Sequence, residues 1–167
     1  MTLTMVIPTY ADRPPFLARA LQYYRALGFR HRILIADSSP APAASANQET
    51  VRALEHHLQV EYQRFAPDIH VIDKLAQALG TITSAYTVLG ADDDFTVPAA
   101  LEEAVDFLER HPDYAVVHGE AVLLAQRAVG PRRELAWATR YLQRSIEQPT
   151  GAQRLLEYLR PYSTTWY

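Results

Sequence analysis

The chain has 167 residues, of which 49% are hydrophobic, and this is enough for one domain with a sizeable core. It contains no cysteine, which excludes disulfide scaffolds, thiolate metal sites and cysteine nucleophiles. A net charge of −3 with both signs interspersed argues against nucleic acid as a partner, and no apolar run approaches the roughly 20 residues of a membrane span. We expect a cytoplasmic protein, with peripheral contact at the inner membrane face as an open alternative.

In its first half the chain alternates predicted strands and helices. Short apolar runs that stop at proline, aspartate or turn residues indicate strands, and apolar residues at helical spacing indicate the helices between them. We predict, in order, a strand at 2–8, a helix capped by Asp12 and ended by Gly28, a buried strand at 33–36, a loop at 38–47, a helix at 48–57 and a strand at 60–65.

The second half begins with the same alternation and then becomes less regular. One apolar stripe predicts a helix that leaves Lys74 on another face, a buried strand follows at 86–89, and Pro98 stands in the first turn of a further helix. We predict a fifth strand at 114–124 and loosely helical structure from 132 onward. The stripe consists of Ile69, Ile72, Leu75, Ala76, Leu79 and Ile82.

Together these elements predict an α/β fold, a mainly parallel sheet flanked by helices and built from right-handed βαβ units. We expect a single domain over 1–167, with a ligand-binding part at 1–125 and the start of a helical part at 126–167. The end of the chain, 160–167, is aromatic, which is unusual for a solvent-facing tail and consistent with a cut within a larger fold.

Three consecutive carboxylates, Asp92, Asp93 and Asp94, follow the predicted strand at 86–89. Such a group is easier to explain if a cation lies beside it, and oxygen ligands favour Mg²⁺ or Mn²⁺. In an extended segment Asp92 and Asp94 point to one side and Asp93 points away. The alternative is that these acids only complement the dipole of the following helix. Asp37, which also ends a buried strand, favours a ligand site at the edge of the sheet.

These motifs resemble those of family 2 glycosyltransferases. The resemblance covers roughly residues 3–120. It rests on the opening segment Val6-Ile7-Pro8-Thr9-Tyr10, on the strand that ends in Asp37, and on Leu89-Gly90-Ala91-Asp92-Asp93-Asp94-Phe95 followed by Pro98. The last segment is similar to the DxD motif of the family, aligned as Asp92-x-Asp94. The resemblance implies a GT-A (Rossmann-like) fold with a truncated acceptor-binding half.

The resemblance also implies the roles of individual residues. Pro8, Thr9 and Tyr10 would line the nucleoside pocket, Asp37 would bind the base or ribose, and Lys74 would lie near the nucleobase. Asp92, with Asp93 beside it, would face the ribose or a water on the metal, and Asp94 would bind the metal. For Lys74 the alternative is an ordinary solvated lysine.

The activity implied is metal-dependent transfer of a sugar, with inversion, from a nucleotide diphosphate sugar to a hydroxyl of a saccharide or other acceptor. The favoured donor is a UDP-sugar and the cofactor is Mn²⁺ or Mg²⁺. A catalytic base is not assigned. The acids after residue 120 stand in no motif, and each has the character of a surface glutamate: Glu120 itself, Glu134, Glu147 and Glu157.

Three other functions remain open from the sequence. The chain is a donor-binding domain if it lacks its own base. A nucleotidyltransferase would use similar acids for Mg²⁺, but such enzymes have a glycine-rich loop after the first strand, where this chain has Thr9-Tyr10-Ala11-Asp12-Arg13. A phosphatase with an aspartate nucleophile would need that residue at the position of Pro8-Thr9.

Overall fold

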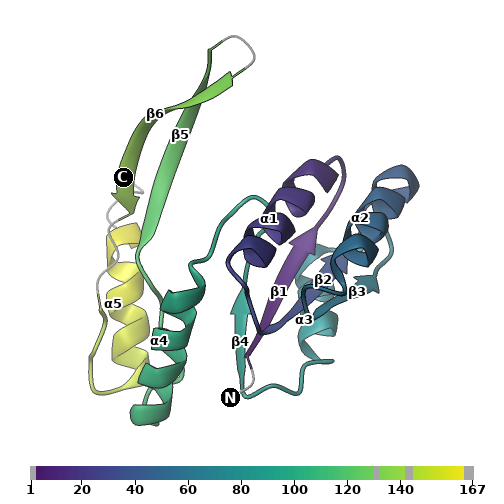
Figure 1. Cartoon of the computed structure of the whole chain (residues 1–167). Helices are drawn as coiled ribbons and strands as arrows, with labels where there is room; N and C mark the ends of the chain where they lie inside the picture. The colour runs from purple at the N-terminus through teal and green to yellow at the C-terminus, as the bar shows by residue number, and fades with distance from the viewer. Residues whose placement is uncertain (1–2, 130–131, 142–144, 164–167) are drawn as a thin grey trace. The chain divides into compact units, whose positions relative to one another are not determined.

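A computed structural model describes residues 3–129, 132–141 and 145–163 of the chain (Figure 1). The chain divides into two compact units, Met1–Val117 and His118–Tyr167, which we call the sheet unit and the hairpin unit. We describe each unit by itself. The single domain over 1–167, with an internal change at residue 125, stays a prediction.

The sheet unit is built on four parallel strands in the order β3-β2-β1-β4 (Figure 1). Helices connect consecutive strands, as parallel pairing requires, and a further helix follows β4. This confirms the predicted parallel α/β architecture. The elements are β1 Leu3–Thr9, α1 Pro14–Ala26, β2 Arg32–Asp37, α2 Ala41–Leu54, β3 Val60–Arg64, α3 Val71–Leu79, β4 Tyr86–Leu89 and α4 Pro98–Arg110.

Alternate residues of the central strands enter two separate hydrophobic clusters. Met5, Ile7, Ile33 and Ile35 pack with buried residues of α1 and α2, including Leu17, Leu21, Tyr24, Val51 and Leu54. Val6, Leu34 and Ala36 pack on the other side with Phe65 and with Ala78 of α3. Because both faces of β1 and β2 are covered, their sequences read as continuous apolar runs, which is the pattern that predicted buried strands.

Gly28 ends α1 in the left-handed conformation, with φ of 63°. The amide of Phe29 donates to the carbonyl of Tyr24 at 2.9 Å and that of Gly28 to Arg25 at 3.1 Å, the two bonds of a Schellman ending. A Cβ at Gly28 would meet no atom within 4 Å, so substitution affects only the backbone conformation. We expect Gly28→Ala to lower the free energy of unfolding by about 1 kcal/mol, and Gly28→Asn by less, in urea denaturation. Equal stability of all three proteins would contradict this.

Four local predictions in the sheet unit are wrong. The strand predicted as buried at 86–89 is β4, an edge strand of the sheet in which Leu89 is 56% exposed. The helix expected at 48–57 begins at Ala41, because Pro42 is tolerated in a first turn and the segment buries Ala43 and Ala44. The side chain of Asp12 does not cap α1, whose N-cap residue is Arg13 without a side-chain cap. Ile72, predicted in the apolar stripe, is 62% exposed, because α3 turns the face that bears Ala78 toward the sheet.

The hairpin unit contains an antiparallel pair, β5 (Ala121–Val129) and β6 (Arg132–Tyr141), followed by α5 (Gly151–Ser163). The fifth strand predicted at 114–124 is therefore wrong in its start and in its partner, because β5 pairs with the next segment of the chain and not with the parallel sheet. The helical prediction is wrong for 132–141 and correct for α5. In β6 Leu135 and Trp137 recur at period two, which is a strand pattern.

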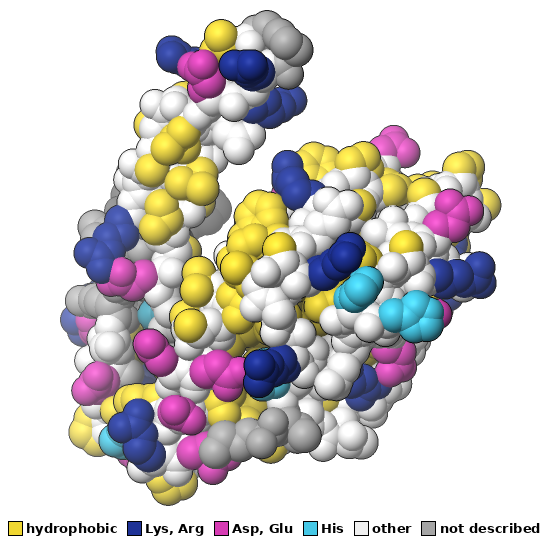
Figure 2. Space-filling model, viewed as in Figure 1, with side chains coloured by type: hydrophobic (Ala, Val, Ile, Leu, Met, Phe, Trp, Pro, Cys, Tyr) yellow, Lys and Arg dark blue, Asp and Glu magenta, His cyan; other side chains and the backbone are white. Residues whose placement is uncertain are grey.

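Large hydrophobic side chains lie exposed along this hairpin (Figure 2). They include Val122, Leu123 and Leu124 of β5 and Leu135 and Trp137 of β6. The aromatic segment at 164–167, singled out in the sequence, lies outside the described residues.

Candidate functional site

The carboxyl ends of β1, β2 and β4 meet at one edge of the sheet. The register pairs Thr9 with Asp37 and Val6 with Leu89, and the amide of Gly90 donates to the carbonyl of Val6 at 2.8 Å. A Cβ at Gly90 would lie 3.3 Å from the side chains of Ile7 and Met5, so glycine lets the chain leave β4 close to β1. The loop after β4 thus carries Asp92 to the end of β1, at the edge where parallel sheets bind ligands.

Asp92 is 3% exposed and both of its carboxylate oxygens accept hydrogen bonds. The hydroxyl of Thr9 donates to Oδ2 at 2.7 Å, and Nε of Arg13 lies 2.7 Å from Oδ1 and 2.9 Å from Oδ2. Nη2 of Arg13 is also 2.6 Å from Oδ1 of Asp92 and 2.6 Å from Oδ2 of Asp93. Asp93, expected to point away, is therefore joined to Asp92 through one guanidinium.

Arg13 is a site residue that the sequence analysis did not identify. Its hydrogen bonds with Asp92, and then with Asp93, raise the pKa of its guanidinium above the ordinary value. Ala11, with φ of 58°, makes a left-handed turn between β1 and α1, just before Arg13. One sequence feature could have indicated this role: Arg13 is the one basic residue in the loop between the first strand and the following helix. That loop ends beside the triplet Asp92-Asp93-Asp94.

Lys74 reaches from α3 into the same edge of the sheet. Its side chain is 3% exposed, and Nζ donates to the carbonyl of Thr9 at 2.9 Å and to Oγ of Ser38 at 2.8 Å. Burial lowers the pKa of Lys74, against the opposing effect of the carboxylates of Asp37 and Asp92. Lys74 is thus a buried cation that joins the ends of β1 and β2, and the alternative of a solvated lysine is wrong.

Asp37 is fully buried at the end of β2. The amide of Ser39 donates to Oδ1 at 2.6 Å, while Nδ2 of Asn47 at 2.8 Å and the hydroxyl of Tyr62 at 2.6 Å donate to Oδ2. Burial alone would raise the pKa of Asp37, but the hydrogen bonds from Ser39, Tyr62 and Asn47 outweigh it and lower the pKa. In this structure the carboxylate organises the loop after β2.

Arg64 continues this network from the end of β3. Its Nη1 donates to the carbonyl of Asp37 at 3.1 Å, and its Nη2 donates to the carbonyl of Ser39. Asn47, Tyr62 and Arg64 were not identified from the sequence, because their connection to Asp37 depends on strand pairing and on the early start of α2. The signal present was the alternation at 60–65, which placed Tyr62 and Arg64 on the same side of a strand.

The remaining predicted site residues lie closer to solvent. Tyr10 is 53% exposed, Pro8 is half-buried, and Asp93 and Asp94 are exposed. Across the described residues, no group of three histidine, aspartate or glutamate side chains is placed to hold a metal ion. Any cation at the triplet would therefore need further ligands from a bound molecule or from water.

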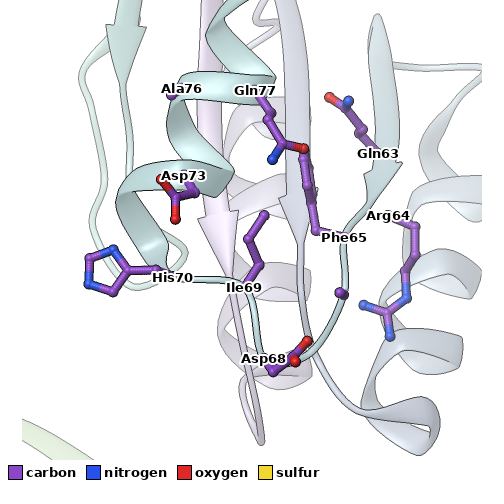
Figure 3. A pocket seen from close by; sticks show the side chains of 10 residues that line it. Gln63, Arg64, Phe65, Asp68, Ile69, His70, Asp73, Ala76 and Gln77 are labelled. Carbon is purple, nitrogen blue, oxygen red and sulfur yellow. The ribbon is translucent and has the colours of Figure 1, made fainter.

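An open groove of about 830 Å³ lies between β3 and α3 (Figure 3). Gln63 and Arg64 lie on its strand side, His70, Asp73 and Gln77 on its helix side, and Phe65 and Ile69 between them. Arg64 lines this groove and also contacts the loop after β2, so the groove borders the network of Asp37. Thr9, Lys74 and Asp92 are not among its lining residues.

In the hairpin unit two of the glutamates left without a role pair with arginines across the strands. Glu120 is bound by Arg140, whose Nε lies 2.9 Å from Oε2, and Glu134 lies 3.5 Å from Arg127. Glu147 is exposed. These three residues fit the expectation of surface glutamates. Glu157 of α5 does not, because its side chain is only 12% exposed and lies 2.8 Å from Nη1 of Arg160.

This architecture is similar to that of solved structures, although comparisons of the sequence found no match. No protein-family model matches the sequence, and no curated protein matches it significantly. Among solved structures, that of residues 1–349 of S. aureus TarS in complex with UDP-GlcNAc superposes with a TM-score of 0.57 and 17% identity, over 79% of this chain and 36% of that one. TarS 1–349 without a named ligand gives a TM-score of 0.55, 16% identity, and coverage of 74% and 35%.

The shared architecture is the Rossmann-like fold of glycosyltransferases. The chain has the GT-A fold. It spans about a third of the length of the TarS 1–349 structures that it matches. In this fold the triplet Asp92-Asp93-Asp94 lies in the loop after β4, beside the end of β1. No helix among the described residues is long and apolar enough to cross a membrane.

Proposed function

We propose that the chain binds a nucleotide diphosphate sugar at the edge formed by β1, β2 and β4, and takes part in transfer of the sugar to an acceptor hydroxyl. The observation that carries this proposal is the meeting of Thr9, Lys74 and Asp92 at one point of a GT-A sheet. In support, TarS, a glycosyltransferase of this fold, has been solved with UDP-GlcNAc and with UDP. A UDP-sugar is therefore the donor we test first.

The triplet is suited to a hard divalent cation. Mg²⁺ and Mn²⁺ are commonly held by one or two carboxylates together with the phosphates of a substrate, so a cage of three protein ligands is not required. Asp94 offers an exposed carboxylate as direct ligand, and we assign Asp92 to the ribose or to a water on the cation, with Asp93 beside them. The cation would stabilise negative charge on the leaving diphosphate.

The nucleoside would lie against the loop after β1. Pro8, Thr9 and Tyr10 end that strand, and the exposed ring of Tyr10 offers a surface for a base. Asp37 would act on the base or ribose by holding the loop after β2 in place, since both of its oxygens already accept hydrogen bonds. Lys74 contributes positive charge beneath this region. We propose inversion at the anomeric carbon from the family resemblance alone.

A second candidate is a donor-binding domain that lacks its own catalytic base. One observation favours it: Glu120 and Glu134 are engaged by arginines. The two candidates share the donor site and differ in turnover. Release of UDP from a UDP-sugar in the presence of simple hydroxyl acceptors would support catalysis by this chain itself.

Calorimetry with UDP, GDP, dTDP and CDP, each with and without Mn²⁺, tests the donor site. We expect one nucleotide to bind, with an affinity that Mn²⁺ raises at least about tenfold, because the cation links the triplet to the diphosphate. Uridine alone is the control, since it lacks the phosphates and should gain nothing from Mn²⁺. Equal nucleotide affinity with and without Mn²⁺, or no binding of any of the four nucleotides, would refute the proposal.

A further inference from the structure

The guanidinium of Arg13 takes up the oxygens that a cation at the triplet would use. Three of its contacts reach Asp92, at 2.7, 2.9 and 2.6 Å, and a fourth reaches Asp93 at 2.6 Å. With the hydroxyl of Thr9 on Oδ2, both oxygens of the buried Asp92 are engaged. A charge-assisted, two-pronged pair of this kind is among the stronger side-chain interactions.

A divalent cation that approaches Asp92 alone therefore meets a positive charge already in place. It has either to displace the guanidinium from a buried carboxylate or to lie within a few ångströms of it, and both alternatives are unfavourable. A nucleoside diphosphate makes the binding of the divalent cation more favourable, because its negative charge offsets the charges of the metal ion and of the guanidinium together. Arginine also binds phosphate oxygens with the same planar fork that it presents to a carboxylate.

The position of Arg13 allows its guanidinium to pass from the carboxylates to a bound diphosphate. Its side chain is 38% exposed, whereas that of Asp92 is 3% exposed, so the guanidinium lies between the buried carboxylate and solvent. It stacks over the ring of Phe16 at 5.1 Å, a contact that is compatible with motion across the ring face. A diphosphate at the triplet can thus be met by Arg13 from the solvent side.

We infer that Arg13 is the resident counter-ion of Asp92 and Asp93, and that it makes the binding of a divalent cation depend on a nucleoside diphosphate that binds with it. This inference rests on the proposed donor site. It assigns to Arg13 a positioning role, in which the guanidinium holds the two carboxylates in place and then passes to the diphosphate. Binding of the cation alone is disfavoured, and joint binding of cation and diphosphate is favoured.

The test is a titration of Mn²⁺ into the full chain with and without UDP, in which free Mn²⁺ is measured by electron paramagnetic resonance. For the wild-type protein we expect UDP to raise the affinity for Mn²⁺ at least about tenfold. In Arg13→Gln, Mn²⁺ should bind without UDP, and the gain from UDP should fall to about threefold or less. Arg13→Lys keeps the charge and should keep most of the dependence.

Arg19→Gln is the matched control. Arg19 lies on α1, the helix that begins directly after Arg13. It stacks over the rings of Phe16 and Phe95 at 5.2 and 5.5 Å, but among the described residues it contacts no carboxylate. Its replacement removes the same charge, so a general loss of positive potential would affect Arg19→Gln and Arg13→Gln alike. The inference requires that Arg19→Gln retain the wild-type response to UDP.

A second measurement is made on the wild-type protein and uses the variant Arg13→Lys only to assign a resonance. The Nε–H resonance of Arg13, identified by its loss in Arg13→Lys, should stay in place with Mg²⁺ alone and shift when Mg²⁺ and UDP are added together. A shift with Mg²⁺ alone, or an equal response of wild type and Arg13→Gln to UDP, overturns the inference and leaves the donor site standing. No binding of Mn²⁺ with or without UDP overturns the proposed function as well.

Discussion

Asp37→Ala is expected to lower the free energy of unfolding of the sheet unit by about 3–5 kcal/mol, one of the largest effects of a single substitution in this chain. The fully buried carboxylate accepts from the amide of Ser39, the amide group of Asn47 and the hydroxyl of Tyr62. Alanine would leave the buried amide of Ser39 without its acceptor. The hydroxyl of Tyr62 and Nδ2 of Asn47 would keep only longer bonds, to the carbonyl of Ala44 at 3.2 Å and to Oγ of Ser39 at 3.4 Å. Urea denaturation followed by far-ultraviolet circular dichroism measures the loss.

Asp68→Ala provides the control for this substitution. Asp68 is exposed on the loop after β3, so its replacement should change the free energy of unfolding by less than about 0.5 kcal/mol. If Asp37→Ala is as stable as Asp68→Ala, the hydrogen-bond network of Asp37 does not stabilise the fold. Asp37 would then be free to act directly on a ligand, as the sequence analysis expected.

The same network predicts a dependence on pH. The pKa of Asp37 in the folded protein lies below its ordinary value, so its ionised form stabilises the fold. This contribution is fully present above the pKa of the unfolded chain, about 3.9, and is lost as the pH falls through the lower folded value. The stability difference between wild type and Asp37→Asn should therefore be constant above about pH 5 and shrink below about pH 4.

Asp94→Ala should remove the metal-dependent part of nucleotide binding, which we expect to lower the affinity for UDP in the presence of Mn²⁺ by roughly 10- to 100-fold. Asp94 is exposed in the loop after β4, so the fold should lose less than about 0.5 kcal/mol. Calorimetry with UDP and Mn²⁺ measures the binding, and thermal unfolding measures the stability.

Asp12→Ala is the companion variant for Asp94→Ala. Asp12 is an exposed acid in the loop between β1 and α1, and removing it changes the net charge by the same amount without touching the triplet. Full retention of the Mn²⁺ effect in Asp94→Ala would assign the cation to other residues. A variant that unfolds would show that the carboxylate has a structural role.

Some site residues follow from local sequence patterns, and others depend on contacts between distant segments. Asp92 was identified because an acid that follows a strand of a parallel sheet reaches the ligand edge, even though that strand, β4, lies at the edge of the sheet and is only partly buried. Arg13, which forms hydrogen bonds with Asp92, lies 79 positions away in the sequence, and no local pattern predicts that contact. Lys74 was predicted to lie near the nucleobase, but its burial became evident only from the packing of α3 against the ends of β1 and β2.

The hairpin unit shows where prediction failed and why. The apolar residues at 121–124 favour a strand, but whether that strand extends the parallel sheet or pairs with its neighbour depends on long-range register. In the sheet unit, buried strands and short loops leave few alternatives. In 114–129 and 132–140 most side chains are exposed and impose no single face, so the local pattern fits several arrangements.

By itself the sequence determined the parallel α/β core and the positions of Asp37 and of the triplet Asp92-Asp93-Asp94, because these follow from hydrophobic periodicity and from the ends of short apolar strands. Only the tertiary structure decided which charges meet. Arg13 pairs with Asp92 and Asp93, Lys74 joins two strand ends, and Asp37 is closed within its own network. Such contacts depend on register, and register is fixed by the packing of the whole sheet.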